Sequence, residues 1–286
     1  MSDFALLLVL SAAFAHATWN YLAKKACGGT AFGWLFGAIS TVVYFPLAIG
    51  ILLYQQPVIG LNQLIFMAGT AVLHCAYFYL LDRGYRIGDL SLIYPLARST
   101  GPLLAMITAV LFLGEKPTLV TITGGLMILA GVFFLTGNPL LLKKADARKP
   151  ALFAILCGIV IASYTVWDKM AVSLYLVPPL LLDWSANLGR TLLLTPYAVQ
   201  NRSKVYEQWK TNKKLAFGVG ILCPLAYILV LTALVFSPVS YIAPAREISI
   251  LVGTVLGAKL LSEGNLKSRM AAAGSMVIGL AVLSLG

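Results

Sequence analysis

Ten apolar segments, each about long enough to cross a bilayer, follow one another along the chain. About 20 helical residues span the hydrocarbon core of a membrane. The predicted transmembrane helices are Phe4–Ala23, Phe32–Tyr54, Asn62–Leu81, Leu90–Leu113, Thr118–Thr136, Ala151–Ser173, Pro178–Val199, Lys214–Phe236, Ser240–Leu261 and Leu266–Leu285. We therefore expect an all-α integral membrane protein with ten transmembrane helices.

The second half of the chain repeats the first. A shift of 148 positions relates four of the five predicted helices of each half, and a shift of 150 relates the second helix to the seventh. The matched pairs include Trp19 with Trp167, Arg98 with Arg246, Glu115 with Glu263, and, at the second shift, Trp34 with Trp184. Because each half has an odd number of spans, the second copy must enter the membrane upside down. The expected organisation is an inverted pair of five-helix repeats, residues 1–138 and 151–286, joined by a short basic linker, residues 139–150.

Inverted repeats of this kind are typical of secondary transporters, whose substrate site lies near the bilayer midplane between the repeats. The composition agrees with a membrane protein, since 60% of the residues are hydrophobic and only 11% are charged. Four scattered cysteines and two histidines show no metal-ligand spacing, so the thiols are interpreted as packing residues and no cofactor or metal is expected.

The net charge of +11 comes mainly from Lys and Arg residues at the ends of the predicted spans. Of the 21 Lys and Arg residues, sixteen flank the predicted spans on one side, two (Lys116 and Lys169) lie on the other, and three lie inside spans. Cationic loops stay in the cytoplasm, so both termini are predicted to be non-cytoplasmic, in the inner (plasma) membrane. The longest basic stretch, Asn201–Lys214, is interpreted as a loop that anchors this topology against anionic lipid, and nucleic-acid binding is not expected.

Arg98 and Arg246 are the most informative residues, because each puts a permanent cation inside an apolar span. Such a charge costs from about 2.5 to more than 10 kcal/mol at the bilayer centre. Pro95 and Pro244 precede them and each frees a backbone carbonyl, which is tolerated where the helix lines a cavity or is buried in protein. A guanidinium presents a planar fork of donors suited to carboxylate, phosphate or phosphonate, so substrate binding is the first interpretation.

The alternative interpretation of these two arginines is a structural ion pair, in which Glu247 or Asp183 neutralises them within the bundle. The same two acids are the carboxylates that sequence position puts well inside spans, and we assign them to coupling or gating. The seventh span carries Asp183, Asn187 and Arg190 on one helical face, where the second span has glycine and serine. This stripe sets either the substrate preference or a gate.

Polar and aromatic residues also share faces of the first and sixth predicted helices. His16, Trp19 and Asn20 lie at i, i+3 and i+4, and their repeat partners are Tyr164, Trp167 and Asp168. Such faces suit a cavity lined by both repeats, although the tryptophans also fit the headgroup level. His16 is either an interhelical histidine or a proton carrier.

Further candidates extend the expected lining of the cavity. Tyr77 and Tyr227, on the third and eighth spans, and Tyr94, just before Arg98, are candidate substrate contacts, and His74 is a candidate for coupling or gating. Glu115 and its repeat partner each precede a span, so they are interpreted as N-terminal caps of the helix that follows.

These residues resemble the drug/metabolite transporter superfamily, in particular its EamA-type members. The resemblance covers the whole chain: ten spans, two halves, a Gly-Glu or Ser-Glu ending the fourth and ninth spans, and the runs Tyr-Pro-Leu-Ala-Arg-Ser-Thr-Gly-Pro and Ala-Pro-Ala-Arg-Glu. It implies basic residues on spans four and nine that hold an anionic substrate, which map onto Arg98 and Arg246. Many relatives keep both termini in the cytoplasm, and the charge count departs from that pattern.

The favoured function is a secondary carrier for a small anionic or zwitterionic metabolite that works by alternating access, with a proton or a counter-substrate as coupling partner. The alternative is a proton-coupled exporter of cationic drugs that uses Asp183 or Glu247. An enzyme is not expected, since no paired carboxylates or nucleophile–base dyad stands out.

Overall fold

The structure, a computed structural model, describes residues 1–87, 90–136, 148–257 and 266–286. Side chains at positions 82, 84–87, 90–92, 94–95, 136, 254–257 and 266–270 are outside this description. The helices are α1 (Asp3–Ala26), α2 (Gly29–Tyr54), α3 (Leu61–Ile87), α4 (Leu90–Phe112), α5 (Leu119–Thr136), α6 (Arg148–Ser173), α7 (Pro179–Gln200), α8 (Arg202–Phe236), α9 (Val239–Ala245), α10 (Ile248–Gly257) and α11 (Leu266–Leu285). The predicted all-α class is confirmed, with α9 and α10 together at the ninth position.

Several of these helices suit a membrane by length and by surface. Within the described residues, α1, α2, α6, α8 and the Leu61–Leu81 part of α3 are each long and apolar enough to span a bilayer. Large apolar side chains point outward on the bundle, for example Leu47, Leu192 and Ile278, which are 55%, 61% and 56% exposed. An outer surface of this kind is stable when it contacts lipid tails instead of water.

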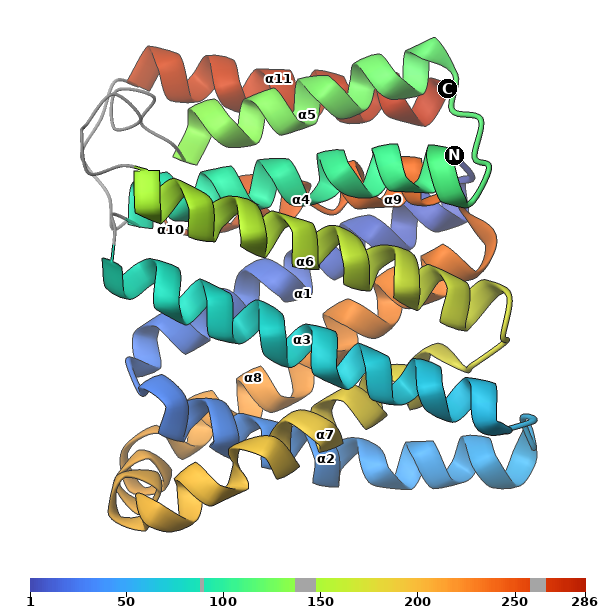
Figure 1. Ribbon diagram of the computed structural model, residues 1–286. Helices are drawn as coiled ribbons and strands as arrows, with labels where there is room; N and C mark the ends of the chain where they lie inside the picture. Colours follow the sequence, from blue (N-terminus) through green and yellow to red (C-terminus); the bar gives the residue numbers. More distant parts are fainter. Residues whose placement is uncertain (88–89, 137–147, 258–265) are drawn as a thin grey trace.

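The packing of the helices shows the two repeats (Figure 1). Helix α1 packs on α8 and α10, and its counterpart α6 packs on α3 and α4. Helix α2 contacts α7 and α8, and its counterpart α7 contacts α2 and α3. Each contact therefore recurs when the two halves are exchanged, and the ten-helix, two-repeat architecture is confirmed. The boundaries of the predicted linker stay a prediction, since most of it lies outside the described residues; α6 begins at Arg148.

Helices α5 and α11, the last helix of each repeat, run antiparallel. A Cβ atom at Gly124 would lie 2.5 Å from the backbone nitrogen of Leu283, and one at Gly131 would lie 2.8 Å from the carbonyl oxygen of Ala272. As the residue number rises along α5, the contacted number falls along α11. Helices at corresponding places in the two repeats therefore cross the bundle in opposite directions, as an inverted repeat requires.

The ninth span is broken where the fourth is continuous. Helix α9 ends at Ala245 and α10 begins at Ile248, whereas α4 runs unbroken past Arg98. At the break, the Glu247 backbone N–H donates to the Pro244 carbonyl at 3.0 Å, a tightened i to i−3 bond. The expected disruption at a proline is therefore present at Pro244, whereas Pro95 does not break α4.

The basic stretch Asn201–Lys214, expected to be a loop, is mostly helical. Helix α8 begins at Arg202, and only Asn212 departs from helical geometry, with φ −120° and ψ 16°. Val205, Gln208 and Asn212 are half-buried at spacings of three and four, which is one helical face. The Asn212 side-chain amide donates to the Ala26 carbonyl at 3.1 Å, so this face docks on the end of α1. The many exposed charged residues on the opposite face made this helical periodicity hard to recognise in the sequence.

The apolar core is continuous at one end of the bundle and divided at the other. Near the chain termini a single cluster joins helices of both repeats, and it includes Val9, Leu182, Leu231, Ile242 and Met276. At the opposite end there are two separate clusters. One joins α1, α2 and α8, and the other joins α4 and α6 with packed residues of α3. The helices therefore pack tightly at the terminal end and form two bundles at the other end.

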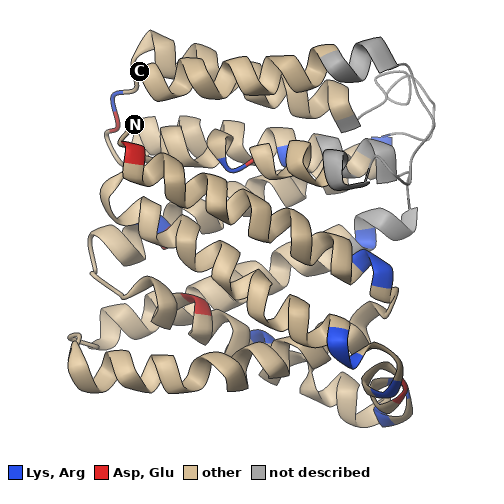
Figure 2. Ribbon diagram, turned by 180° about the vertical axis from the view of Figure 1, so that it is seen from behind, with Lys and Arg blue, Asp and Glu red and all other residues tan. Residues whose placement is uncertain are grey.

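Lys and Arg residues gather at the end with the divided core. Figure 2 shows them opposite the N- and C-termini, with few acidic residues among them. We name this the basic end and its opposite the terminal end. At the terminal end the Lys169 ammonium donates to the carbonyls of Leu234 and Ser237, at 2.6 and 3.0 Å, where it caps the C-terminus of α8.

Glu115 caps a helix of the other repeat, and the predicted cap of α5 was wrong. Its carboxylate accepts the backbone N–H groups of Val239 and Ser240 at 2.7 and 2.9 Å, and the Ser240 hydroxyl at 2.7 Å. These are the first residues of α9. The N-terminus of α5 is capped by Thr118, whose hydroxyl accepts the Thr121 N–H at 3.1 Å. The repeat partner Glu263 lies outside the described residues.

Removing the Glu115 cap is expected to destabilise the terminal end. Glu115→Ala leaves the N-terminal donors of α9 without their carboxylate, and losing an N-cap costs about 0.5–2 kcal/mol. Thermal unfolding in detergent micelles should show a lower midpoint for this variant than for Glu207→Ala, a matched change of an exposed acid on α8. Equal midpoints for the two variants would contradict this role.

Candidate functional site

A cavity of about 300 Å³ lies inside the bundle, between the helices of the two basic-end clusters. Its walls come from α1, α3, α4, α6, α7, α8 and the break between α9 and α10. Along α1 the lining runs from Ala12 to Asn20, and along α3 from His74 to Leu81, so the cavity extends toward the basic end. The continuous core lies between the cavity and the terminal end.

Arg98 and Arg246 both line this cavity, from α4 and from the helix break. They are 5% and 7% exposed. Glu247, which has no exposed surface, lies between them: its Oε2 is 2.8 Å from Nη2 of Arg98, and its Oε1 is 3.6 Å from Nε of Arg246. Each arginine is thus paired with Glu247, as the ion-pair interpretation expects, and also faces the hollow.

Glu247 itself does not line the cavity. A single carboxylate therefore lies behind both guanidinium groups, and Nη2 of Arg246 has no hydrogen-bond partner among the described residues. Arg98 also approaches the Ser249 hydroxyl, at 3.5 Å. Unpaired buried charge is strongly disfavoured, so this arrangement holds both cations in place while keeping positive charge at the cavity wall.

The polar stripe of α7 forms a hydrogen-bonded chain that also faces the cavity. The Asn187 amide donates to Asp183 Oδ2 at 2.9 Å, and Nη2 of Arg190 donates to the Asn187 carbonyl oxygen at 2.7 Å. The Arg190 guanidinium lies between the rings of Phe36 and Phe78, at 4.9 and 5.1 Å from their centroids. Two aromatic faces thus hold a third arginine in a fixed orientation.

Asp168, on α6, is the centre of a polar cluster that the sequence analysis missed as a site. It is completely buried, and its Oδ1 accepts the Thr70 hydroxyl at 2.6 Å. Its Oδ2 accepts the Tyr227 hydroxyl and lies 3.3 Å from Nε2 of His74. The sequence placed Asp168 on the same helical face as Trp167. The prediction that only Asp183 and Glu247 are carboxylates well inside the spans was wrong, since Asp168 is also buried. The available signal was its repeat partner, Asn20.

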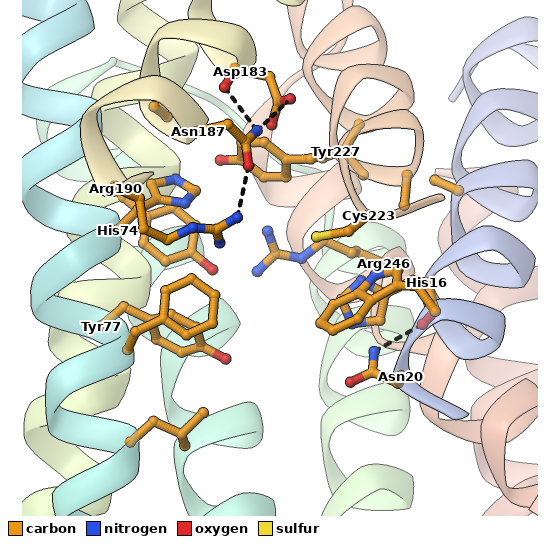
Figure 3. A pocket seen from close by; sticks show the side chains of 18 of the residues that line it. His16, Asn20, His74, Tyr77, Asp183, Asn187, Arg190, Cys223, Tyr227 and Arg246 are labelled. Carbon is orange, nitrogen blue, oxygen red and sulfur yellow. Dashed lines mark hydrogen bonds between the residues drawn. The ribbon is translucent and has the colours of Figure 1, made fainter. Parts of the chain in front are cut away.

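His16, Trp19 and Asn20 all line the cavity from α1. The rings of His16 and Trp19 meet edge to face, 5.0 Å apart, and the Asn20 amide donates to the His16 carbonyl at 2.8 Å. Figure 3 shows His16, Asn20 and Arg246 on one side of the hollow and His74, Tyr77 and Arg190 on the other. For Trp19, the structure selects the cavity over the interfacial belt.

Trp167 does not line the cavity, which corrects the prediction made from its repeat partner. Its Nε1 donates to the Phe66 carbonyl at 2.9 Å, and its ring packs 4.4 Å from the Phe66 ring and against Gly69. A Cβ atom at Gly69 would lie 2.4 Å from the Trp167 ring, so this glycine makes room for the indole. One residue along the helix, Asp168 points to the other side, toward His74.

Tyrosines complete the wall. Tyr77, Tyr164 and Tyr227 line the cavity as predicted. The ring of Tyr164 lies 5.9 Å from the Arg246 guanidinium carbon and 4.4 Å from the His74 ring. The predicted contact Tyr94 falls among the side chains outside the described residues.

The lining carries more buried donors than the surrounding protein satisfies. The buried N–H groups without a hydrogen-bond partner among the described residues include Nε1 of Trp19, Nε of Arg190 and Nη2 of Arg246. All three side chains face the cavity. A buried donor without an acceptor costs about 1–3 kcal/mol, so the cavity suits a guest that supplies several acceptor oxygens. The described residues contain no group of three or more His, Cys, Asp or Glu side chains that could hold a metal ion.

Comparison with known proteins agrees with this architecture. The chain is similar over its whole length to a solved crystal structure described only as "Crystal structure of protein", with a TM-score of 0.73, 16% sequence identity and coverage of 98% of each chain. At that identity the likeness shows the fold alone. A comparison with curated proteins gave no match.

The family of the chain is shown by its sequence. The pattern of the EamA-like transporter family matches twice, at residues 3–137 and 148–285, which are the two repeats. The matched segments cover nearly all of the chain. The protein therefore belongs to the EamA-like transporter family, whose members are integral membrane transporters.

Proposed function

We propose that the protein is a secondary active transporter of a small anionic or zwitterionic metabolite, such as a carboxylate, phosphate or phosphonate compound or an amino acid. The observation that carries this proposal is the donor-rich cavity wall, with guanidinium groups of Arg98, Arg190 and Arg246 facing one hollow. Its volume of about 300 Å³ is at the lower end of the range of about 300–1,000 Å³ for small-molecule sites.

In this proposal Arg98 and Arg246 bind the anionic group. Glu247 holds both guanidiniums from behind, so their orientation is set before a ligand arrives, and a charge-assisted hydrogen bond to a pre-oriented fork is strong. The rings of Trp19, Tyr77 and Tyr164 offer contact surface to the organic part of the substrate.

The opposite wall gives this site room for a zwitterion. Asp183 lines the cavity on α7, and its carboxylate is held by Asn187. The ammonium group of an amino acid substrate fits beside the Asp183 carboxylate, while the substrate's own carboxylate lies at the arginines. A purely cationic drug fits less well, because it meets three guanidiniums, and Glu247 is engaged with two of them.

The packing supports alternating access as the mechanism. The divided core at the basic end and the continuous core at the terminal end fit a carrier that faces the basic end. The units that move in this proposal are the two bundles, one containing α1, α2 and α8 and the other containing α3, α4 and α6. Each bundle mixes helices of both repeats, so the moving units of this proposal are not the two halves of the sequence.

We place the protein in the inner (plasma) membrane with the basic end in the cytoplasm and both termini outside, as the positive-inside rule implies. The described conformation is then open toward the cytoplasm. Membrane lipids, with their anionic headgroups, contact the basic end.

Ligand binding provides the first test. Purified protein should gain thermal stability with at least one of four probes: methylphosphonate, glycerol 3-phosphate, succinate or alanine. A ligand that binds only the folded state stabilises it by mass action. Stabilisation by hydrophobic cations and by none of the four probes would contradict the proposal and favour a cation exporter that uses Asp183.

Arginine variants test the site itself. Arg98→Gln and Arg246→Gln should each weaken binding of the stabilising probe by about 10- to 150-fold, because a hydrogen bond to a charged group contributes about 1.5–3 kcal/mol. Uptake into proteoliposomes should fall in parallel, while Arg202→Gln, an exposed change on α8, should leave it intact. Pairing each variant with Glu247→Gln removes the buried unpaired carboxylate, so a folding defect is separated from a binding defect. Undiminished uptake in both single variants would refute the assignment.

Orientation is tested by labelling cysteines in intact cells with a membrane-impermeant maleimide. Cys27 is exposed near the basic end, and Lys116 is exposed at the terminal end. With the other thiols replaced by alanine, Lys116→Cys should react from outside and Cys27 should react only after the cells are broken open. The reverse pattern would invert the proposed topology.

A further inference from the structure

The cluster around Asp168 is built differently from the other buried acids of the cavity. Glu247 compensates arginines, and Asp183 is held by an amide of its own helix. Asp168 has side-chain partners from two other helices: Thr70 and His74 on α3, and Tyr227 on α8. Of these partners only His74 can change its charge between about pH 5 and 8.

The hydrogen bonds of Asp168 specify where a proton goes. The Thr70 hydroxyl donates to Oδ1 and the Tyr227 hydroxyl donates to Oδ2, which suits an ionised carboxylate, since that form only accepts. The remaining contact, from His74 Nε2 to Oδ2 at 3.3 Å, needs a proton on Nε2, which one tautomer of the neutral imidazole already carries. A second proton, on Nδ1, would make an imidazolium whose charge faces the Asp168 carboxylate.

His74 also connects this pair to the cavity. It is among the lining residues, with a side chain 17% exposed, whereas the Asp168 side chain is 0% exposed. A proton thus reaches the pair from cavity water through the imidazole, and Asp168 stays behind it as the balancing charge. The Tyr164 and Tyr227 rings flank the imidazole at 4.4 and 5.1 Å.

The charges around His74 connect proton binding to anion binding. The groups that share its surroundings are Tyr77 on its own helix, Tyr164 and Asp168 on α6, Tyr227 on α8, Asp183 and Arg190 on α7, and, across the cavity, His16, Arg98 and Arg246 with Glu247 behind them. Three guanidiniums thus stand against three carboxylates among these described residues. An anionic guest would leave one net negative charge in a low-dielectric interior, and one proton on His74 restores neutrality.

We propose that His74 and Asp168 form the proton-binding site that couples transport to a proton gradient. When an anion binds at the arginines, the His74 imidazole takes one proton from hydronium in the cavity and leaves water, so anion and proton cross together without net charge change. By thermodynamic reciprocity each ligand then strengthens binding of the other. The coupling rests on the proposed function; the proton site itself does not.

The chain offers a direct spectroscopic test, because it contains only two histidines. Protein with isotope-labelled histidine in lipid nanodiscs should give two imidazole signals by NMR, and His16→Asn assigns them. Spectra are recorded from about pH 8 to pH 5, and the His74 signal should gain the chemical shifts of an imidazolium as the pH falls. At the same pH the imidazolium fraction should be smaller in Asp168→Asn than in wild type, and Asp183→Asn should reduce it less. If Asp168→Asn does not fold, Thr70→Val should change the imidazolium fraction in the same direction.

Two NMR results would overturn the proton site: His74 staying neutral throughout this range, or an unchanged imidazolium fraction in Asp168→Asn. A larger reduction in Asp183→Asn than in Asp168→Asn would move the site to Asp183. None of these outcomes depends on knowing the substrate.

Coupling is tested in proteoliposomes with the same four probes. An inward proton gradient should raise accumulation by wild-type protein at least about tenfold, and His74→Gln or Asp168→Asn should abolish this increase while exchange of labelled for unlabelled probe continues. If wild-type protein exchanges the probe but the proton gradient does not change its accumulation, the coupling is refuted and the proposed function is not. Absence of exchange for every probe would refute the proposed function and leave the NMR result to stand or fall separately.

Discussion

The bundle depends on the compensation of buried arginines by one buried carboxylate. Arg98 and Arg246 come from helices that are far apart in sequence and related by the repeat, and Glu247 sits between them with no exposed surface. A charged side chain inside a membrane protein almost always faces the bundle interior or a water-filled cavity and pairs with another charge or with backbone carbonyls. The pairing joins α4 to the break between α9 and α10, and so it fixes the point where the fourth span of one repeat meets its counterpart. The cavity forms on the other side of the same two side chains.

Much of this architecture was predictable because it follows from spacing. Ten apolar segments, the shift that pairs Arg98 with Arg246, and the odd number of spans per half lead to an inverted ten-helix repeat without any tertiary information. The cavity-facing residues of α1 and α7 were also predictable, since helical periodicity puts them on one face. Which of the two spans is broken was not predictable, because Pro95 and Pro244 look equivalent in the sequence, and only the ninth span is interrupted.

The residues that were misassigned share one cause: their partners come from other helices. Trp167 looks like its repeat partner Trp19, but it packs on Phe66 and Gly69 of α3. Glu115 looks like a cap for the next helix, but the free N–H groups that it reaches belong to α9 in the other repeat. Asp168 sits near the end of a predicted span beside a lysine, where an exposed acid is expected. Its burial depends on Thr70 and Tyr227, which no local pattern connects to it.

The divided core at the basic end has a consequence for which residues this chain tolerates there. In a carrier that closes at this end, side chains such as Leu35, Ile39, Ile93 and Ala97 meet new neighbours in each half of the cycle. They must therefore fit two different sets of contacts. The same holds for Val9 and Leu231 in the continuous core, which lose their present contacts when the terminal end opens. A substitution that improves packing in only one of the two conformations traps the molecule in that conformation. Contacts that can be exchanged between the two conformations are thus a requirement of turnover in such a carrier, and a variant selected only for heat resistance would be expected to carry its cargo more slowly.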